Sequence, residues 1–192
     1  PSEHIKKGRH IHILGYSQKT HGGFVALVKK AKDLGLTVSC DVGWDPTEKW
    51  DISIFDMLSF VDVFTPNQVE ALSYTRAQNP EEALEVLSKY VSMPAIKMGR
   101  LGSMGKRNGV AAYMPSFKVN SVDTTGAGDS FNAGFIYSFL RELPIDQALS
   151  VANACGALST TAYGGNTAFP TLKQLKTFFY ELGEKYQDIS LE

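Results

Sequence analysis

The 192-residue sequence has only two cysteines, almost no net charge and no long apolar run. Cys40 and Cys155 lack the spacing of a metal site, and lone cysteines in apolar surroundings are typical of buried thiols in a reducing, cytoplasmic protein. With Lys+Arg 19 against Asp+Glu 20, the net charge is −1 and leaves no electrostatic footprint for nucleic acid. No basic run suggests a membrane surface, and no apolar stretch approaches the ~20 residues of a membrane span. We therefore expect neither a nucleic-acid partner nor a membrane partner.

Two common phosphate-binding motifs are also missing. No Gly-x4-Gly-Lys-Ser/Thr occurs, which excludes a Walker A loop. No Gly-x-Gly-x-x-Gly follows the first expected strand with an acid ~20 residues later, which disfavours dinucleotide binding. The 43% hydrophobic and 20% charged residues are instead typical of an ordinary globular protein. The length suits one core, so we expect residues 1–192 to form a single domain.

Alternating sequence patterns predict an α/β fold. Strands are expected at 10–14, 36–41, 61–65 and 93–98, separated by helices at 24–34, 52–60, 67–74 and 80–91. This alternation predicts βαβ units and a parallel sheet that binds ligands beyond the carboxyl ends of its strands. Asn108-Gly109 predicts a hairpin between 103–107 and 110–114. Helices are then expected at 129–142, 145–161 and 171–182.

Three smaller features also lead to expectations. His10 and His12 share one face of the first expected strand, but no third ligand is near, so we expect hydrogen-bonded or solvated histidines rather than a metal pair. Gly22-Gly23 is expected to be a loop rather than a phosphate cradle. In the last helix, the residues expected to face inward are Leu172, Leu175, Phe178, Phe179 and Leu182.

The most informative stretch is Asp123-Thr-Thr-Gly-Ala-Gly-Asp129, which leads into a long helix with an apolar face. A glycine-rich turn that opens a helix presents unpaired backbone N–H groups at the positive end of the helix dipole, and glycine lets a phosphate approach closely. The carboxylate of Asp129 is unexpected in a site that suits anions. On local physics alone, Asp129 either caps the helix or acts on a bound ligand.

The run DTTGAGDSFNAGF resembles the C-terminal signature of the ribokinase-like (PfkB-type) carbohydrate kinases. The resemblance implies a Rossmann-like three-layer α/β/α sandwich with a mostly parallel sheet. It also implies ATP-dependent phosphotransfer to a hydroxyl of a sugar or related small molecule, with ATP and Mg²⁺ as cofactors. By matching positions, Asp129 is the catalytic base, and Gly126, Ala127 and Gly128 form the anion hole.

The resemblance also implies nucleotide-binding residues elsewhere in the chain. Asn67 and Glu70 share the first turn of an expected helix. They either cap this helix or form the family's Asn-x-x-Glu element, which lies near the phosphates and magnesium. We favour the second interpretation, with Glu70 acting on the magnesium through water. The segment from Lys97 through Gly99 to Gly102 matches the family's nucleotide-binding Gly-x-x-Gly and also fits a plain turn before the hairpin.

Two further matches to the family concern a contact with the adenine base and a site for a monovalent cation. Asn153 matches an adenine contact, although the small residues around it are equally typical of close helix packing. Asp123 and Thr125 match a K⁺ site that some relatives use, together with backbone carbonyls near Ser159, Ala162, Gly164 and Ala168.

The resemblance extends over nearly all of this chain but corresponds to only the C-terminal two-thirds of a family member. The family's N-terminal strands and β-lid have no counterpart, and the first residue is Pro1. We therefore expect a fragment with little kinase activity alone. A nucleoside or vitamin kinase of the same superfamily and a non-catalytic nucleotide-binding or interaction module are the alternatives. The expected partner is a small-molecule alcohol, and homo-oligomerisation is left open.

Overall fold

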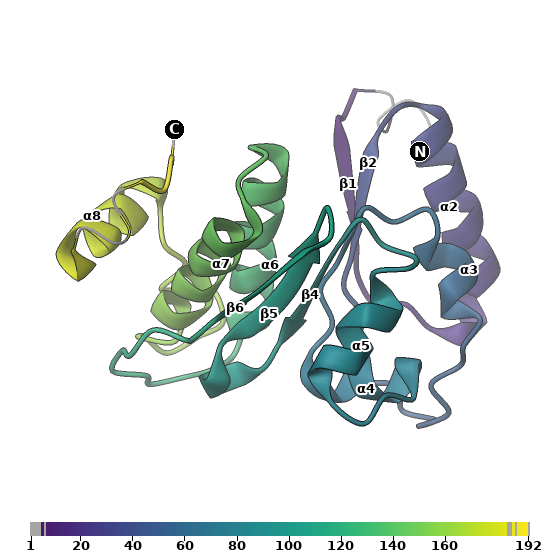
Figure 1. Cartoon of the computed structure of the whole chain (residues 1–192), viewed down its shortest axis with the longest axis horizontal. Helices are drawn as coiled ribbons and strands as arrows, with labels where there is room; N and C mark the ends of the chain where they lie inside the picture. The colour runs from purple at the N-terminus through teal and green to yellow at the C-terminus, as the bar shows by residue number, and fades with distance from the viewer. Residues whose placement is uncertain (1–4, 6, 184–185, 187, 192) are drawn as a thin grey trace. The chain divides into compact units, whose positions relative to one another are not determined.

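The computed structural model describes residue 5, residues 7–183, residue 186 and residues 188–191 (Figure 1). These residues form the predicted α/β fold, with a mostly parallel six-stranded sheet in the order β1-β2-β3-β4-β5-β6. The chain divides into a first compact unit of residues 1–98 and 104–111 and a second unit of residues 99–103 and 112–192. The expected single domain over residues 1–192 stays a prediction.

The parallel strands of the first unit follow one another in chain order. Their central residues, such as Val38, Phe64 and Ile96, are fully buried, as expected for a parallel sheet covered on both faces. The predicted strand at 61–65 is shorter in the structure, and next to it the Asp62 carboxylate accepts the Val38 N–H at 2.7 Å. The strands are β1 (His10–Ile13), β2 (Thr37–Cys40), β3 (Val63–Phe64) and β4 (Met93–Lys97).

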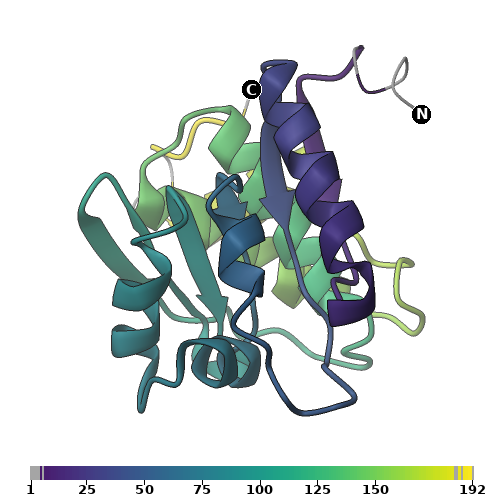
Figure 2. The ribbon, with the colours of Figure 1, turned by 90° about the vertical axis from the view of Figure 1, so that its right-hand side faces the viewer.

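Helix α2 (His21–Asp33) begins earlier than predicted. It includes Gly22-Gly23, so the expectation of a loop there was wrong. The reason is the preceding 3-10 turn η1 (Gln18–Thr20), closed by hydrogen bonds between Ser17 and Thr20, which leads directly into the helix. Figures 1 and 2 show α2 beside α3. The other helices of this unit are α3 (Ile54–Leu58), α4 (Gln68–Thr75) and α5 (Pro80–Leu87).

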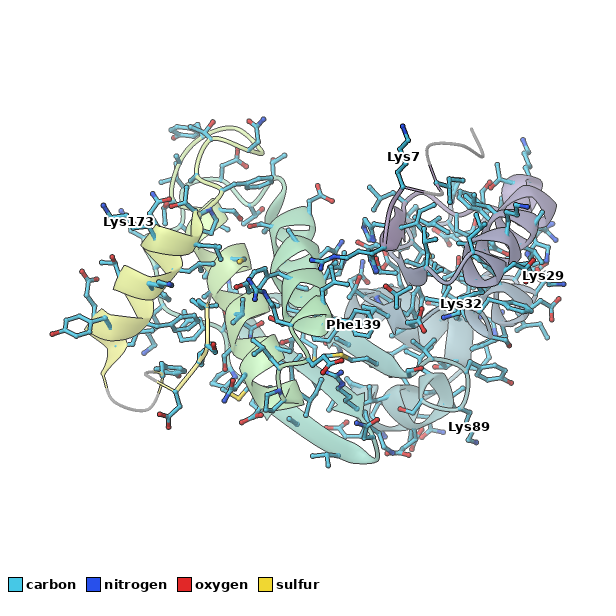
Figure 3. The ribbon with its side chains drawn as sticks, turned by 90° about the horizontal axis from the view of Figure 1, so that it is seen from above. Lys7, Lys29, Lys32, Lys89, Phe139 and Lys173 are labelled. Atoms are coloured by element: carbon cyan, nitrogen blue, oxygen red, sulfur yellow. The ribbon has the colours of Figure 1, made fainter. Side chains whose placement is uncertain are left out.

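Polar side chains join β1, β2 and α2. His10 hydrogen-bonds the Thr37 and Ser39 hydroxyls at 2.8 Å, and His12 also bonds Ser39, which confirms the expectation of hydrogen-bonded histidines. Burial lowers the pKa of His10. Lys32 of α2 (Figure 3) places its Nζ 2.7 Å from Oδ1 of Asp62. Within the part of the chain that the structure describes, no group of three or more His, Cys, Asp or Glu side chains could hold a metal ion.

The predicted hairpin consists of β5 (Ser103–Arg107) and β6 (Val110–Met114). Both turn residues have positive φ, 51° at Asn108 and 80° at Gly109, which matches a two-residue turn of the primed type. Such a turn twists in the same sense as its strands, and this is why the Asn-Gly pair alone was enough to locate the hairpin.

The second unit is built on α6 (Ala127–Leu140) and α7 (Ile145–Ser159), which lie side by side (Figure 1). Gly134 allows this close approach, because a Cβ there would lie 2.8 Å from the Cys155 sulfur. The Phe131 and Phe135 rings are buried and stacked, with centroids 5.9 Å apart. Burial raises the pKa of the Cys155 thiol to about 12, so this cysteine is the inert buried thiol that was expected.

Helix α8 (Leu172–Leu182) has Thr171 as its N-cap residue, and the side chains of Thr171 and Gln174 form a capping box. Leu175 and Phe179 are buried as expected, but Leu172 and Leu182 are each 42% exposed, so their predicted inward orientation was wrong. These two leucines lie in the end turns of the helix, where less of the unit is available to cover them. Among the described residues, no helix is both long and apolar enough to cross a membrane.

Candidate active site

The N-terminus of α6 is capped by glycine backbone rather than by a carboxylate. Gly126 is the N-cap residue, with φ 76° and ψ 0°, and no side chain bonds the cap. Asp129 is therefore the third residue of the helix, and its side chain is exposed, as is Gly128. The structure does not support the cap interpretation of Asp129. An exposed carboxylate instead lies beside first-turn amides that have no acceptor within the helix.

One of the three predicted anion-hole amides has a partner inside the turn. The Ala127 N–H donates to the Thr124 carbonyl at 3.2 Å, whereas the Ser130 N–H makes the first regular helical bond, to Gly126 at 2.9 Å. The turn otherwise suits an anion, because the exposed Gly128 lies in the first turn of a 14-residue helix, at the positive end of the helix dipole.

The turn is packed tightly against the loop that follows α7. A Cβ on Gly126 would lie 2.0 Å from the Gly165 carbonyl oxygen, so only glycine fits. The positive φ of Gly126 adds a second reason, since a side chain rarely adopts it. The Val122 and Asp123 N–H groups also both donate to the Thr160 carbonyl, at 2.7 and 3.1 Å. The backbone around the proposed anion hole is thus held by contacts within the second unit.

Asp123 connects the same two segments through its side chain. Oδ1 accepts the Thr125 N–H at 2.9 Å and Oδ2 accepts the Gly164 N–H at 3.0 Å. These two backbone donors lower the pKa of Asp123, so it is a carboxylate at neutral pH. Both predicted K⁺ residues therefore already have a structural role. A cation there would be bound chiefly by backbone carbonyls. The K⁺ site stays a prediction.

Asn67 and Glu70 form a capping box at the start of α4. Oδ1 of Asn67 accepts the Glu70 N–H at 2.9 Å, and Oε2 of Glu70 accepts the Asn67 N–H at 2.8 Å. The cap interpretation is thus correct as a local description. Because both oxygens already accept backbone N–H groups, this donor set fits a hydrated Mg²⁺ held through water better than direct ligation. The metal role stays a prediction.

The buried carboxyl of Glu70 leads to a prediction of pH dependence. It is 4% exposed, and desolvation raises its pKa above the ordinary 4.5. Folding therefore favours the protonated carboxyl. This contribution to the free energy of unfolding is fully present at low pH, and it is lost as the pH rises through the raised pKa of Glu70. Glu70→Gln should become steadily more stable relative to wild type over that interval, because glutamine keeps an acceptor oxygen without a charge. Urea unfolding at several pH values measures this, and parallel pH curves for the two proteins would contradict it.

The sequence patterns did not predict an ion pair between Asp41 and Lys97. Asp41 follows β2 and Lys97 ends β4, and their side chains meet at 2.6 Å with only 10% and 15% exposed. Asn67 follows β3 between them and pairs with Lys97 as a parallel bridge. These three residues therefore gather at the carboxyl ends of adjacent strands, the edge where such sheets bind ligands. Opposite charges at the carboxyl ends of β2 and β4 were the available signal, and they do not by themselves specify a pairing.

The predicted nucleotide-binding turn is a short 3-10 helix, η2 (Gly99–Leu101), ending at Gly102. Gly99 and Gly102 have φ values of 58° and 101°, which explains why glycine stands at both. The Tyr113 hydroxyl donates to the Leu101 carbonyl at 2.6 Å. Lys97 precedes this turn with its ammonium held by Asp41, and its contact with a nucleotide stays a prediction.

Asn153, the predicted adenine contact, is buried at 5% exposure. Its side chain bonds the Ser103 hydroxyl and the carbonyls of Met114 and Pro115. The predicted close packing around Asn153 is confirmed by the buried Ala152, Ala154 and Cys155 of α7, and the adenine contact stays a prediction.

Known carbohydrate kinases are similar to this chain. Residues 2–172 match the family described as pfkB family carbohydrate kinase. The chain belongs to this family. It is 32% identical over 129 residues to a ribokinase of Haemophilus influenzae, an overlap of 64% of this chain and 42% of the relative.

Solved structures show the same fold. A putative ribokinase II from E. coli in complex with ATP and Mg²⁺ matches with a TM-score of 0.83 and 27% identity, over 94% of this chain and 61% of that one. A fructokinase double mutant from Vibrio cholerae O395, with fructose, ADP and a potassium ion bound, matches with a TM-score of 0.75 and 26% identity, over 90% of this chain and 60% of that one. This pfkB-family chain thus spans less than two thirds of each of these relatives.

Proposed function

We propose that the chain forms the nucleotide-binding and catalytic part of an ATP-dependent kinase that phosphorylates a hydroxyl of a sugar or related small molecule. The supporting observation is the exposed Asp129 carboxylate in the first turn of α6, where the cap is glycine backbone. The helix dipole by itself favours a carboxylate in this turn, but an exposed carboxylate next to a phosphate site is also placed to act on the second reactant. Membership of the pfkB family supports the same reaction class.

In this proposal, Asp129 accepts the proton of the acceptor hydroxyl as its oxygen attacks the γ-phosphorus. The new O–P bond forms as the bond to the ADP oxygen breaks. Amides of Gly126, Ala127 and Gly128 stabilise charge on the phosphoryl oxygens. The Ala127 N–H would have to leave Thr124 to take part, whereas Gly128 is already in the exposed first turn.

Asn67 and Glu70 would hold Mg²⁺ through water, and when bound the ion would neutralise phosphate charge. Lys97, Gly99 and Gly102 would border the nucleotide. We also propose a potassium ion near Asp123 and Thr125; the potassium ion in the Vibrio cholerae fructokinase structure supports use of this ion, though not its position. The Asp123 carboxylate would then act mainly by fixing the loop whose carbonyls surround the ion.

Calorimetry with the 192-residue chain tests the proposal directly. We expect ATP with Mg²⁺ to bind, inorganic tripolyphosphate to compete for the site, and K⁺ to strengthen binding relative to Na⁺. Slow ADP formation should then appear with at least one member of a panel of ribose, fructose, a nucleoside and a vitamin alcohol. ATP binding without transfer to any acceptor would favour a non-catalytic nucleotide-binding module, and failure to bind ATP would overturn the proposal.

A further inference from the structure

The buried amide of Asn153 joins three segments of the second unit. Its Oδ1 accepts the Ser103 hydroxyl at 2.9 Å, and its Nδ2 donates to Met114 O at 2.9 Å and Pro115 O at 3.2 Å. These contacts define the Asn153 clamp, which links α7 to the start of β5 and the end of β6. A primary amide has two N–H hydrogens, and each has a backbone carbonyl to accept it.

The orientation of this amide follows from its partners. Two carbonyl oxygens can only accept, so the NH₂ group must face Met114 and Pro115, and Oδ1 must face the hydroxyl of Ser103. Ser103 is fully buried and Asn153 is 5% exposed. Breaking the clamp would leave buried polar groups without partners, which is more costly than losing an exposed hydrogen bond.

The segments held by the clamp are those that shape the Gly99–Gly102 turn. Ser103 directly follows this turn, and a Cβ on Gly102 would lie 2.1 Å from Met114 O. The carbonyl that fills the space next to Gly102 is thus the same one that accepts from Asn153. The Gly102 N–H closes the turn by donating to Gly99 O at 3.0 Å. Asn153 therefore holds both the turn and the strand end against which it packs.

We infer that Asn153 is a positioning residue that fixes the Gly99–Gly102 turn for the nucleotide, rather than a group that reads the adenine base. Its amide hydrogens are used within the protein, and its Oδ1 accepts from Ser103 on a side chain that is only 5% exposed, so we expect discrimination between bases not to depend on it. The role in nucleotide binding rests on the proposed function, whereas the clamp itself rests only on the geometry of the second unit.

Two measurements on Asn153→Ala in the full 192-residue chain test the inference. Hydrogen exchange of the Gly102 amide should become about tenfold faster, since unpaired buried groups destabilise the turn. Affinities for ATP and for GTP should fall together by about tenfold, so that their ratio stays at the wild-type value. Asn153→Asp should behave similarly, because its carboxylate can accept from Ser103 but cannot donate to the two carbonyls.

Ser150→Ala is the matched control. Ser150 is equally buried on α7, one turn earlier, and its hydroxyl bonds only within the helix, to Asp146 O at 2.9 Å. It should leave both Gly102 exchange and nucleotide affinity unchanged. If Asn153→Ala does not fold, Ser103→Ala provides a milder variant, which should shift exchange and both affinities in the same direction by less.

Several outcomes would overturn the inference. A selective loss of ATP affinity, with GTP affinity and Gly102 exchange unchanged, would show that Asn153 reads the base. Unchanged exchange in both Asn153 variants would show that the clamp does not hold the turn. If the wild-type chain binds no nucleotide, the proposed function fails, but the exchange measurement still decides whether the clamp exists.

Discussion

Asp129→Asn should lower the rate of phosphotransfer by about 10²–10⁴-fold, the range that a positioned general base contributes. Asparagine has nearly the same shape but cannot accept the hydroxyl proton at neutral pH. ATP affinity should be unchanged or somewhat tighter, because a negative charge leaves the neighbourhood of the phosphates. A single-turnover measurement, with the chain in excess over ATP and an acceptor from the panel, detects slow transfer, and calorimetry gives the affinity.

Asp146→Asn serves as the matched control for this prediction. Asp146 is also an exposed acid in the first turn of a helix, α7, and therefore experiences a comparable helix dipole. Its replacement should leave the transfer rate at the wild-type level. The assignment of Asp129 as base would be wrong if Asp129→Asn kept the wild-type rate. A parallel loss of ATP binding would instead indicate a structural role for the carboxylate.

Gly126→Ala should reduce the free energy of unfolding by about 3–5 kcal/mol and abolish ATP binding. Alanine is strained at a φ of 76°, and its Cβ would collide with the Gly165 carbonyl at 2.0 Å. Because the contact is with backbone, a side-chain rotation cannot relieve it. The turn or the loop after α7 must move, and the amides proposed to bind phosphate move with it. Urea unfolding and calorimetry give the two quantities.

The control variant Gly35→Ala separates the cost of the positive φ from the cost of the Cβ collision. Gly35 has almost the same φ, 77°, but a Cβ there would have nothing within 4 Å. Its replacement should lower the free energy of unfolding only by the cost of placing alanine in the left-handed conformation, about 1–2 kcal/mol, and should leave ATP binding intact. If the two alanine variants lose equal stability, the close packing of Gly126 on Gly165 has no energetic consequence. If Gly126→Ala still binds ATP normally, the anion hole lies elsewhere.

Local chemistry made much of the fold predictable. The period of the apolar residues located the strands and helices, and Asn108-Gly109 located the hairpin, because each signal acts over a few neighbouring residues. Errors arose where a neighbouring element changed the local preference. Gly22-Gly23 reads as a loop in isolation, but the preceding turn closed by Ser17 and Thr20 continues them into α2. Leu172 and Leu182 have the correct spacing for an inward face but lie at the ends of α8.

The candidate site divides in the same way. Short-range patterns already specified the glycine-rich turn, the helix after it, the acid at position 129 and the capping pair of Asn67 and Glu70, because their partners are at most a few residues apart. They also established the family, which the comparisons confirm.

Long-range packing was needed for the remaining roles. The carboxylate of Asp41 meets Lys97 across 56 residues, and the amide of Asn153 meets Ser103 across 50. No periodicity or motif specifies such pairs, since each depends on how strand ends and helices are brought together. The same packing excludes Asp129 as the cap of α6 and commits the amide of Asn153 to protein partners, because position in the folded chain determines which groups can reach a side chain.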